Sequence, residues 1–152
     1  MAKKAEMTMN KKAEQFQAYL DKNEMKFFQV QELQDEFHTV VFRSNIEVQG
    51  QKLPTIVITD DTIWTLIRSQ IVAGAVAADK KAAIEEFLNG LNAKYKVFKF
   101  YVTEGNDINM DICVPTIPEQ FDAEMVRSLL QISVEQLMEL YPQIMEVVWG
   151  KK

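Results

Sequence analysis

The spacing of apolar residues changes period several times along this chain, and this change constrains the fold more than any other feature. Apolar side chains three or four positions apart indicate a helix with one buried side. Strict alternation of apolar and polar side chains indicates a half-buried strand. Helical spacing is found in residues 10–22, 79–95 and 122–149, and alternating spacing in residues 37–48, 53–59, 98–102 and 108–114.

Residues 62–72 fit either kind of element. Ile63, Leu66, Ile67 and Ile71 would suit a helix capped by an aspartate. The density of Ile, Thr, Val and Trp in this segment favours a strand, because β-branched and aromatic side chains pack well on a pleated surface. We therefore predict a strand over Thr62–Val72 and keep the helix as the alternative.

Polar residues and prolines predict where the elements begin and end. Asn10, Asp79 and Asp122 each precede a helical stretch, where their side chains can accept backbone N–H groups as N-caps. Pro54 cannot donate to a ladder and is expected at a strand start or on an open edge. Pro142 disfavours helical geometry at the residue before it, so we expect a kink or a restart in the last helix.

The resulting order is α-β-β-β-α-β-β-α. Three amphipathic helices and a mainly antiparallel sheet make an α+β domain, with the sheet packed against the helices. A length of 152 residues fits one domain. We expect a single domain over residues 1–152, with residues 1–9 as a flexible N-terminal tail.

Composition narrows the partners that the chain can have. A formal net charge of −5 argues against binding nucleic acid, which needs Lys and Arg to neutralise phosphates. No stretch approaches the roughly 20 apolar residues that span a bilayer, so no membrane partner is expected. Cys113 is the only cysteine, which rules out an internal disulfide and fits a reducing compartment. The expected location is the cytoplasm.

The chain contains parts of two metal-binding patterns, but neither pattern is complete. Asp107, Asn109 and Asp111 have the spacing of a calcium loop, but Ile112 and Pro118 occupy the positions that need Gly and Glu. The alternation of this segment favours a strand with a polar outer side. His38 and Cys113 are too few soft ligands for a zinc site. No metal and no cofactor are expected.

His38 is the one candidate for a general base. Glu36, two residues earlier, would lie on the same strand face and could orient it. Cys113 is expected to be a small residue under partial cover, because a reactive thiolate needs a cationic neighbour. Asp60 and Asp61 are explained by turn chemistry. Phosphate-binding glycine motifs are absent, so we expect no enzymatic activity.

The outer face of the predicted sheet is the candidate binding surface. If the apolar stripes point at the helices, the other face exposes a tryptophan, a tyrosine and an arginine among aliphatic residues, a composition enriched at protein–protein interfaces. The alternative is that a tail, the last helix or a flipped strand covers them. The candidate residues are Trp64, Leu66, Arg68, Val72, Lys99 and Tyr101, with Gln70, Val41 and Val57 beside them.

The element order, with Phe37-His38-Thr39-Val40-Val41-Phe42 opening the sheet, resembles the YbjN family of bacterial sensory transduction regulators. The resemblance covers about residues 10–149, and it implies a type III secretion chaperone-like fold. It further implies a small bacterial cytosolic protein, often dimeric, that works by binding other proteins. No catalytic residue follows from the resemblance.

Two functions remain open. The leading hypothesis is a non-enzymatic interaction module, chaperone-like or regulatory, that binds a protein partner or itself as a homodimer through the outer sheet face. The alternative is a small-molecule sensor with an apolar cavity between sheet and helices, lined by residues such as Phe42, Phe98, Phe100 and Met110. An enzyme built around His38 is a distant third.

Overall fold

The computed structural model describes residues 9–150, which form three α-helices, six strands and one 3-10 turn. The expected N-terminal tail lies outside the described residues except for Met9, which is partly buried against the core. The elements are α1 (Lys11–Lys22), β1 (Gln29–Glu32), β2 (Val40–Val48), β3 (Gln51–Thr59), β4 (Trp64–Val72), α2 (Lys81–Lys94), β5 (Lys99–Val102), β6 (Ile108–Pro115), η1 (Pro118–Gln120) and α3 (Ala123–Trp149).

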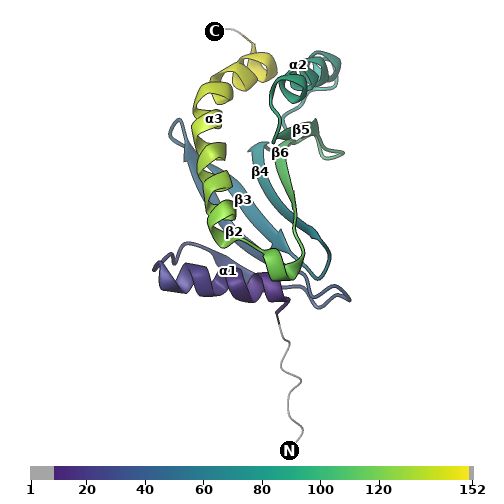
Figure 1. Cartoon of the computed structure of the whole chain (residues 1–152). Coiled ribbons are helices and arrows are strands. Elements are labelled where there is room, and N and C mark those ends of the chain that lie inside the picture. The colour runs from purple at the N-terminus through teal and green to yellow at the C-terminus, as the bar shows by residue number, and fades with distance from the viewer. Residues whose placement is uncertain (1–8, 151–152) are drawn as a thin grey trace, which may run out of the picture.

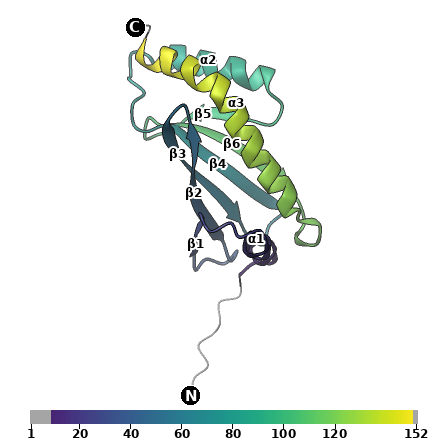
Figure 2. The same ribbon diagram turned by 90° about the vertical axis from the view of Figure 1, so that its left-hand side faces the viewer.

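The six strands form one antiparallel sheet in the order β1-β2-β3-β4-β6-β5. The long helix α3 crosses one face of this sheet, with α1 at one end and α2 at the other (Figure 1). Viewed from the side, all three helices lie on the same side of the sheet (Figure 2). The core lies between them, and no described helix covers the opposite face, which we call the outer face.

The predicted α+β class and element order are confirmed, and so is the strand over residues 62–72. The structure adds one short strand, β1, whose four residues are all exposed. Its sequence, Gln-Val-Gln-Glu, has no second apolar residue to produce a recognisable alternation. The predicted first strand, 37–48, starts later, at Val40, because His38 has a φ of +52° and belongs to the preceding turn.

Helix α1 is anchored to the sheet by two polar side chains at its start. The Asn10 side chain accepts from the Ala13 backbone N–H, as predicted for an N-cap, and donates to the His38 carbonyl oxygen. Lys12 is fully buried, and its Nζ donates to the carbonyl oxygens of Thr62 and Trp64 and to Thr65 Oγ1 at 2.8–3.0 Å. Burial lowers the pKa of Lys12, because the charged ammonium loses its hydration.

The end of α1 is a Schellman motif with an unusual residue in it. The Met25 N–H donates to the Leu20 carbonyl at 2.9 Å, and the Glu24 N–H donates to the Asp21 carbonyl at 3.2 Å. Glu24 takes the left-handed position that glycine usually fills, at φ +54°. The motif turns the chain sharply, so that residues 25–28 run back along the sheet toward β1.

The strand edges without a neighbouring strand include the outer edge of β5 and the side of the first residues of β3 that would face β4. At the β5 edge, the Asn92 side chain from α2 accepts from the Phe100 N–H at 2.7 Å and donates to the Phe100 carbonyl at 3.0 Å. One amide therefore replaces the missing strand at that position. Pro54 lies in the part of β3 that β4 does not pair with, on an open edge as predicted.

One of the predicted helix caps needs correction. Asp79 is not an N-cap, because α2 starts at Lys81 and the cap position is held by Lys80 without a side-chain bond. Asp122 does cap α3, accepting from the Met125 N–H. Of the two outcomes expected at Pro142, a kink or a restart, the structure shows no restart: α3 continues through Pro142, and its axis bends toward α2 near its C-terminal end (Figure 1).

The structure supplies a partner at the position where Pro142 removes a helical hydrogen bond. Proline has no N–H, so the carbonyl four residues earlier, on Met138, loses its helical donor. Gln49, in the turn between β2 and β3, donates its Nε2 to that carbonyl at 2.9 Å. The β2–β3 hairpin is therefore attached to α3 at the point where the helix is interrupted.

We predict that Gln49→Ala lowers the free energy of unfolding by about 1 kcal/mol, the usual net contribution of one hydrogen bond. In a Pro142→Ala background the backbone N–H of the introduced alanine can satisfy the Met138 carbonyl, so the same change should have almost no effect. Urea unfolding of the four variants measures this coupling. Gln143→Ala is the control, because the Glu139 carbonyl that it contacts keeps its helical donor. Equal losses in both backgrounds would contradict the assignment.

The outer sheet face and the pocket beside helix α3

The six predicted surface residues lie on two strands, β4 and β5, which are separated in the sheet by β6. Trp64 on β4 has 53% of its surface exposed, and Leu66 and Arg68 follow it on the same face, half-buried. Across β6, Lys99 on β5 is exposed and lies in one cross-strand row with Arg68, while Tyr101 is half-buried in the next row. Five of the six candidate residues are therefore on one face.

Two of the predicted outer residues face the core instead. Val72 is only 6% exposed, because a β-bulge between Gln70 and Val72 shifts the alternation, and Val72 pairs with Ile108. Val57 is completely buried and pairs with Phe42 and Ile67, both core residues. The strict alternation expected from the sequence does not hold through a bulge, and the predicted outward direction of Val57 on β3 is wrong.

Arg68 and Tyr101 are engaged in a polar network around Asp111. Arg68 donates to both Asp111 carboxylate oxygens, at 2.9 and 3.0 Å, and the Tyr101 hydroxyl donates to Asp111 Oδ2 at 2.9 Å. The Lys99 ammonium lies 5.2 Å from the centre of the Tyr101 ring. The Asp111 side chain is only 3% exposed. The hydrogen bond to Asp111 raises the pKa of Arg68, and burial raises the pKa of Tyr101.

We predict that Arg68→Met lowers the free energy of unfolding by about 2–3 kcal/mol, because it leaves the buried Asp111 carboxylate without its bidentate partner. Adding Asp111→Asn to this variant should recover part of the loss, since a neutral amide is less costly to bury than an unpaired charge. Thermal and urea unfolding measure both. A loss below about 0.5 kcal/mol for Arg68→Met would show that the network contributes little, as for an exposed ion pair.

An apolar row, only partly recognised from the sequence, crosses the middle of the outer face. Val41, Ile58 and Leu66 are directly paired neighbours on β2, β3 and β4, and Ile56 lies in the adjacent row. Ile56, Ile58 and Leu66 are half-buried although no described helix lies over them. The continuous Ile-Val-Ile run in β3 is apolar on both faces, and that was the available signal for two-sided burial.

Trp64 precedes Leu66 by two positions on the same face of β4, and three other exposed apolar residues belong to the loops at this end of the sheet. Phe37, Ile63 and Ile117 are 46%, 44% and 44% exposed. Backbone bonds hold their loops together: Asp61 N–H donates to the Phe37 carbonyl, and Thr116 N–H to the Ile63 carbonyl. The residues Phe37, Ile63, Trp64 and Ile117, which we call the Trp64 patch, come from three separate loops and strand ends. Sequence reasoning singled out only Trp64. Phe37 and Ile63 fall inside the predicted strands 37–48 and 62–72, but the structure places both in loops, before β2 and β4 begin.

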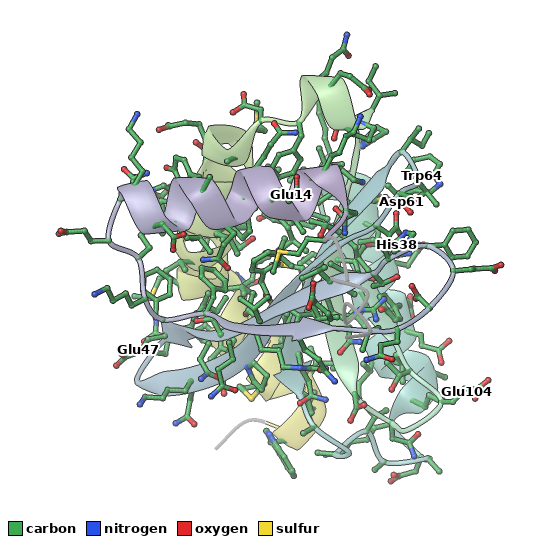
Figure 3. The ribbon with its side chains drawn as sticks, turned by 90° about the horizontal axis from the view of Figure 1, so that it is seen from below. Glu14, His38, Glu47, Asp61, Trp64 and Glu104 are labelled. Carbon is green, nitrogen blue, oxygen red and sulfur yellow. The ribbon has the colours of Figure 1, made fainter. Side chains whose placement is uncertain are left out.

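His38 lies beside the Trp64 patch and is paired with Asp61. His38 Nδ1 is 2.6 Å from Asp61 Oδ2, and both side chains are about half exposed. Seen from below, His38, Asp61 and Trp64 gather at one end of the sheet (Figure 3). The predicted partner Glu36 is wrong, because His38 lies in a turn and not on a strand. The hydrogen bond that His38 donates to the Asp61 carboxylate raises the pKa of His38.

We predict that an NMR titration of His38, the single histidine, gives a pKa above the ordinary value of about 6.5. Because the folded-state pKa is raised, the stabilisation is complete below the unfolded-state pKa and is lost as pH rises through the folded-state pKa. Asp61→Asn should return the pKa to its ordinary range. Glu36→Gln should leave the His38 pKa unchanged. A His38 pKa that falls in Glu36→Gln and stays raised in Asp61→Asn would show that Glu36, and not Asp61, is the partner.

The remaining chemical candidates are accounted for by local structure. Asp60 accepts from the Thr62 N–H and hydroxyl, the turn role predicted for it. Asp107 accepts from the Gly74 N–H and the Thr103 hydroxyl at a loop, and Asp111 belongs to the network above. Cys113 is exposed rather than partly covered. Within residues 9–150, no group of three His, Cys, Asp or Glu side chains is placed to hold a metal ion.

The residues expected to line an apolar cavity do not line the pocket that the structure contains. Phe42, Phe98, Phe100 and Met110 are all at most 6% exposed and belong to the packed core. A pocket of about 380 Å³ does open between the sheet and α3, on the side nearest β1. It is lined by Met25, Phe27, Phe28, Ser44, Asn45, Ile46, Thr55, Arg127, Leu130, Gln131 and Val134.

These features define a class of protein: a sheet backed by helices on one face, with an open outer face and an apolar pocket. The model of one family, YbjN, described as "Putative bacterial sensory transduction regulator", matches residues 12–146, so this chain belongs to the YbjN family. No curated protein matches it. Among residues 9–150, no helix has the length and apolar character needed to cross a membrane.

Proposed function

We propose that this protein is a non-enzymatic regulator that binds a protein partner, or a second copy of itself, through the outer face of its sheet. One observation carries the proposal: the face opposite the helices has an apolar row beside the exposed Trp64, and the other exposed apolar residues of the Trp64 patch lie in the loops at that end of the sheet. Exposed apolar residues grouped on one face indicate an interaction site more often than scattered ones do. Regulation by binding also agrees with the family's description.

The chemistry of the face supports a protein partner. Trp, Tyr and Arg side chains are enriched where interfaces are strongest, and Trp64 is more than half exposed. The Arg68–Asp111–Tyr101 network beside the apolar row holds its side chains in place before binding, which reduces the entropy lost on association. Cys113, the single cysteine, cannot form an internal disulfide, and we propose the cytoplasm as the location.

Photo-crosslinking tests this surface directly. With benzoylphenylalanine in place of Trp64, irradiation in the native cell should give discrete higher-mass adducts. With the same residue in place of Glu135, exposed on α3, it should give none. Trp64 is suited to this because its indole makes no hydrogen bond within residues 9–150, whereas replacing Arg68 would leave Asp111 unpaired. The masses of the adducts distinguish a foreign partner from a second copy.

The second readout is the variant Trp64→Asp in a chain that carries benzoylphenylalanine at Leu66. A charge within the Trp64 patch should reduce the adduct yield about tenfold or more, because apolar burial is lost and a carboxylate is desolvated. Circular dichroism confirms that the variant folds. Equal adduct yields from the Trp64 and Glu135 positions, or an unchanged yield in Trp64→Asp, would refute the outer face as the binding surface.

A second candidate function is a small-molecule sensor, and the pocket beside α3 favours it. Its volume falls at the lower end of the range of roughly 300–1,000 Å³ found for ligand sites. Its walls are mostly apolar, with a few polar groups, as in such sites generally. The pocket lies on the helix side of the sheet, so occupying it does not compete with binding on the outer face.

A further inference from the structure

The pocket of the second candidate function has one charged side chain in its lining. Ile46 on β2 and Leu130 and Val134 on α3 form apolar walls, and Phe27 and Phe28 close the end nearest α1. Ser44, Asn45, Thr55 and Gln131 add neutral polar groups. Arg127 alone among the lining residues carries a charge. It lies one turn before Leu130 and Gln131, so it stands at the α1 end of the pocket wall that α3 provides.

Arg127 differs from the other two arginines of the chain in what it contacts. Arg68 is neutralised by the Asp111 carboxylate, and Arg43 donates twice to the Gln31 side-chain oxygen. Arg127 donates from Nη1 to the Tyr19 hydroxyl at 3.2 Å, and no ion pair between described residues includes it. The guanidinium has five N–H donors, so most of them remain for another acceptor.

Neighbouring groups orient the guanidinium without neutralising it. The Tyr19 hydroxyl, which accepts from Arg127, in turn donates to Glu124 Oε1 at 3.4 Å. The hydrogen bond to Tyr19 raises the pKa of Arg127, with a smaller contribution from the Glu124 charge. The guanidinium is thus held by α1 while keeping its full positive charge next to an apolar pocket. Water solvates this charge when the pocket is empty, and a carboxylate would replace that water bidentately.

The rim of the pocket includes an exposed aromatic side chain, Phe27, whose apolar surface a bound ligand would remove from water. Phe27 is 60% exposed, and its ring centroid lies 5.0 Å from that of Phe28, which packs on Phe16 and Phe42. The Schellman motif at Glu24 places this segment along the pocket. An apolar chain lying between Phe27 and Leu130 would remove that surface from water at roughly 25 cal/mol per Å².

We propose that this pocket binds a small amphiphile with an apolar chain and a carboxylate head, held by Arg127. The apolar part lies against Phe27, Ile46 and Val134, and the head group accepts from the free guanidinium donors. The inference rests on the sensor function, to which it adds the chemical class of the ligand. A neutral or cationic head group leaves the guanidinium without a new acceptor and gains only the apolar contacts.

Two probes of equal chain length separate the head group from the chain. Decanoate and decanol, each below the concentration at which it aggregates, are titrated into the full chain by isothermal titration calorimetry. Decanoate should bind about tenfold more tightly, and raising the salt concentration should reduce its affinity while leaving that of decanol unchanged. Amide chemical-shift changes on binding should centre on Ile46, Leu130 and Val134.

The matched variants are Arg127→Met and Arg43→Met. Methionine keeps an unbranched apolar stem and removes the charge in both. Arg127→Met should lower decanoate affinity about tenfold, to that of decanol. Arg43→Met, on the outer face, should leave it unchanged. Val134→Trp, which fills the pocket, should abolish binding of both probes.

The results distinguish a failure of the carboxylate assignment from a failure of the sensor function itself. If both probes bind with equal affinity and Arg127→Met has no effect, the pocket takes apolar ligands and the carboxylate class is wrong. If neither probe binds, or the shift changes lie away from the pocket, the sensor function fails and this inference fails with it. A decanoate preference that disappears only in Arg127→Met supports both.

Discussion

The rest of the structure depends on one constraint: helices cover a six-stranded sheet on one face only. Helix α3, with seven buried residues over 27 positions, spans most of that face, and α1 and α2 close its ends. One helix is narrower than the sheet it crosses, which leaves the pocket beside β2. The opposite face stays open to solvent, so its apolar row and the Trp64 patch follow from the same layer arrangement.

Polar side chains satisfy the backbone and strand ends that this arrangement leaves without partners. Gln49 supplies the donor that Pro142 cannot, Asn92 takes the place of a strand beside Phe100, and Lys12 binds carbonyl oxygens where β4 begins. Each contact joins segments that lie far apart in the sequence or in different elements. Buried polar groups without partners are costly, so these contacts determine how hairpin, helix and sheet are held together.

The two candidate sites lie on opposite faces of the same sheet. Strand β2 contributes Val41 to the outer face and Ile46 to the pocket, so a ligand that shifts β2 or β3 would also change the outer face. His38, paired with Asp61 next to Trp64, adds a titratable group to the edge of the outer face. Binding on each face can nevertheless be tested separately, because the variants designed for one face do not touch the other.

The sequence by itself determined the class of fold, the helices, five of the six strands and two N-caps, because periodicity and capping are local properties. It also placed Trp64, Leu66, Arg68, Lys99 and Tyr101 on one face. Only the tertiary structure decided that a bulge turns Val72 inward, that Asp61 rather than Glu36 meets His38, and that Arg127 borders the pocket. These depend on pairing register and on loops that meet in space, and a one-residue shift in register moves every side chain to the other face.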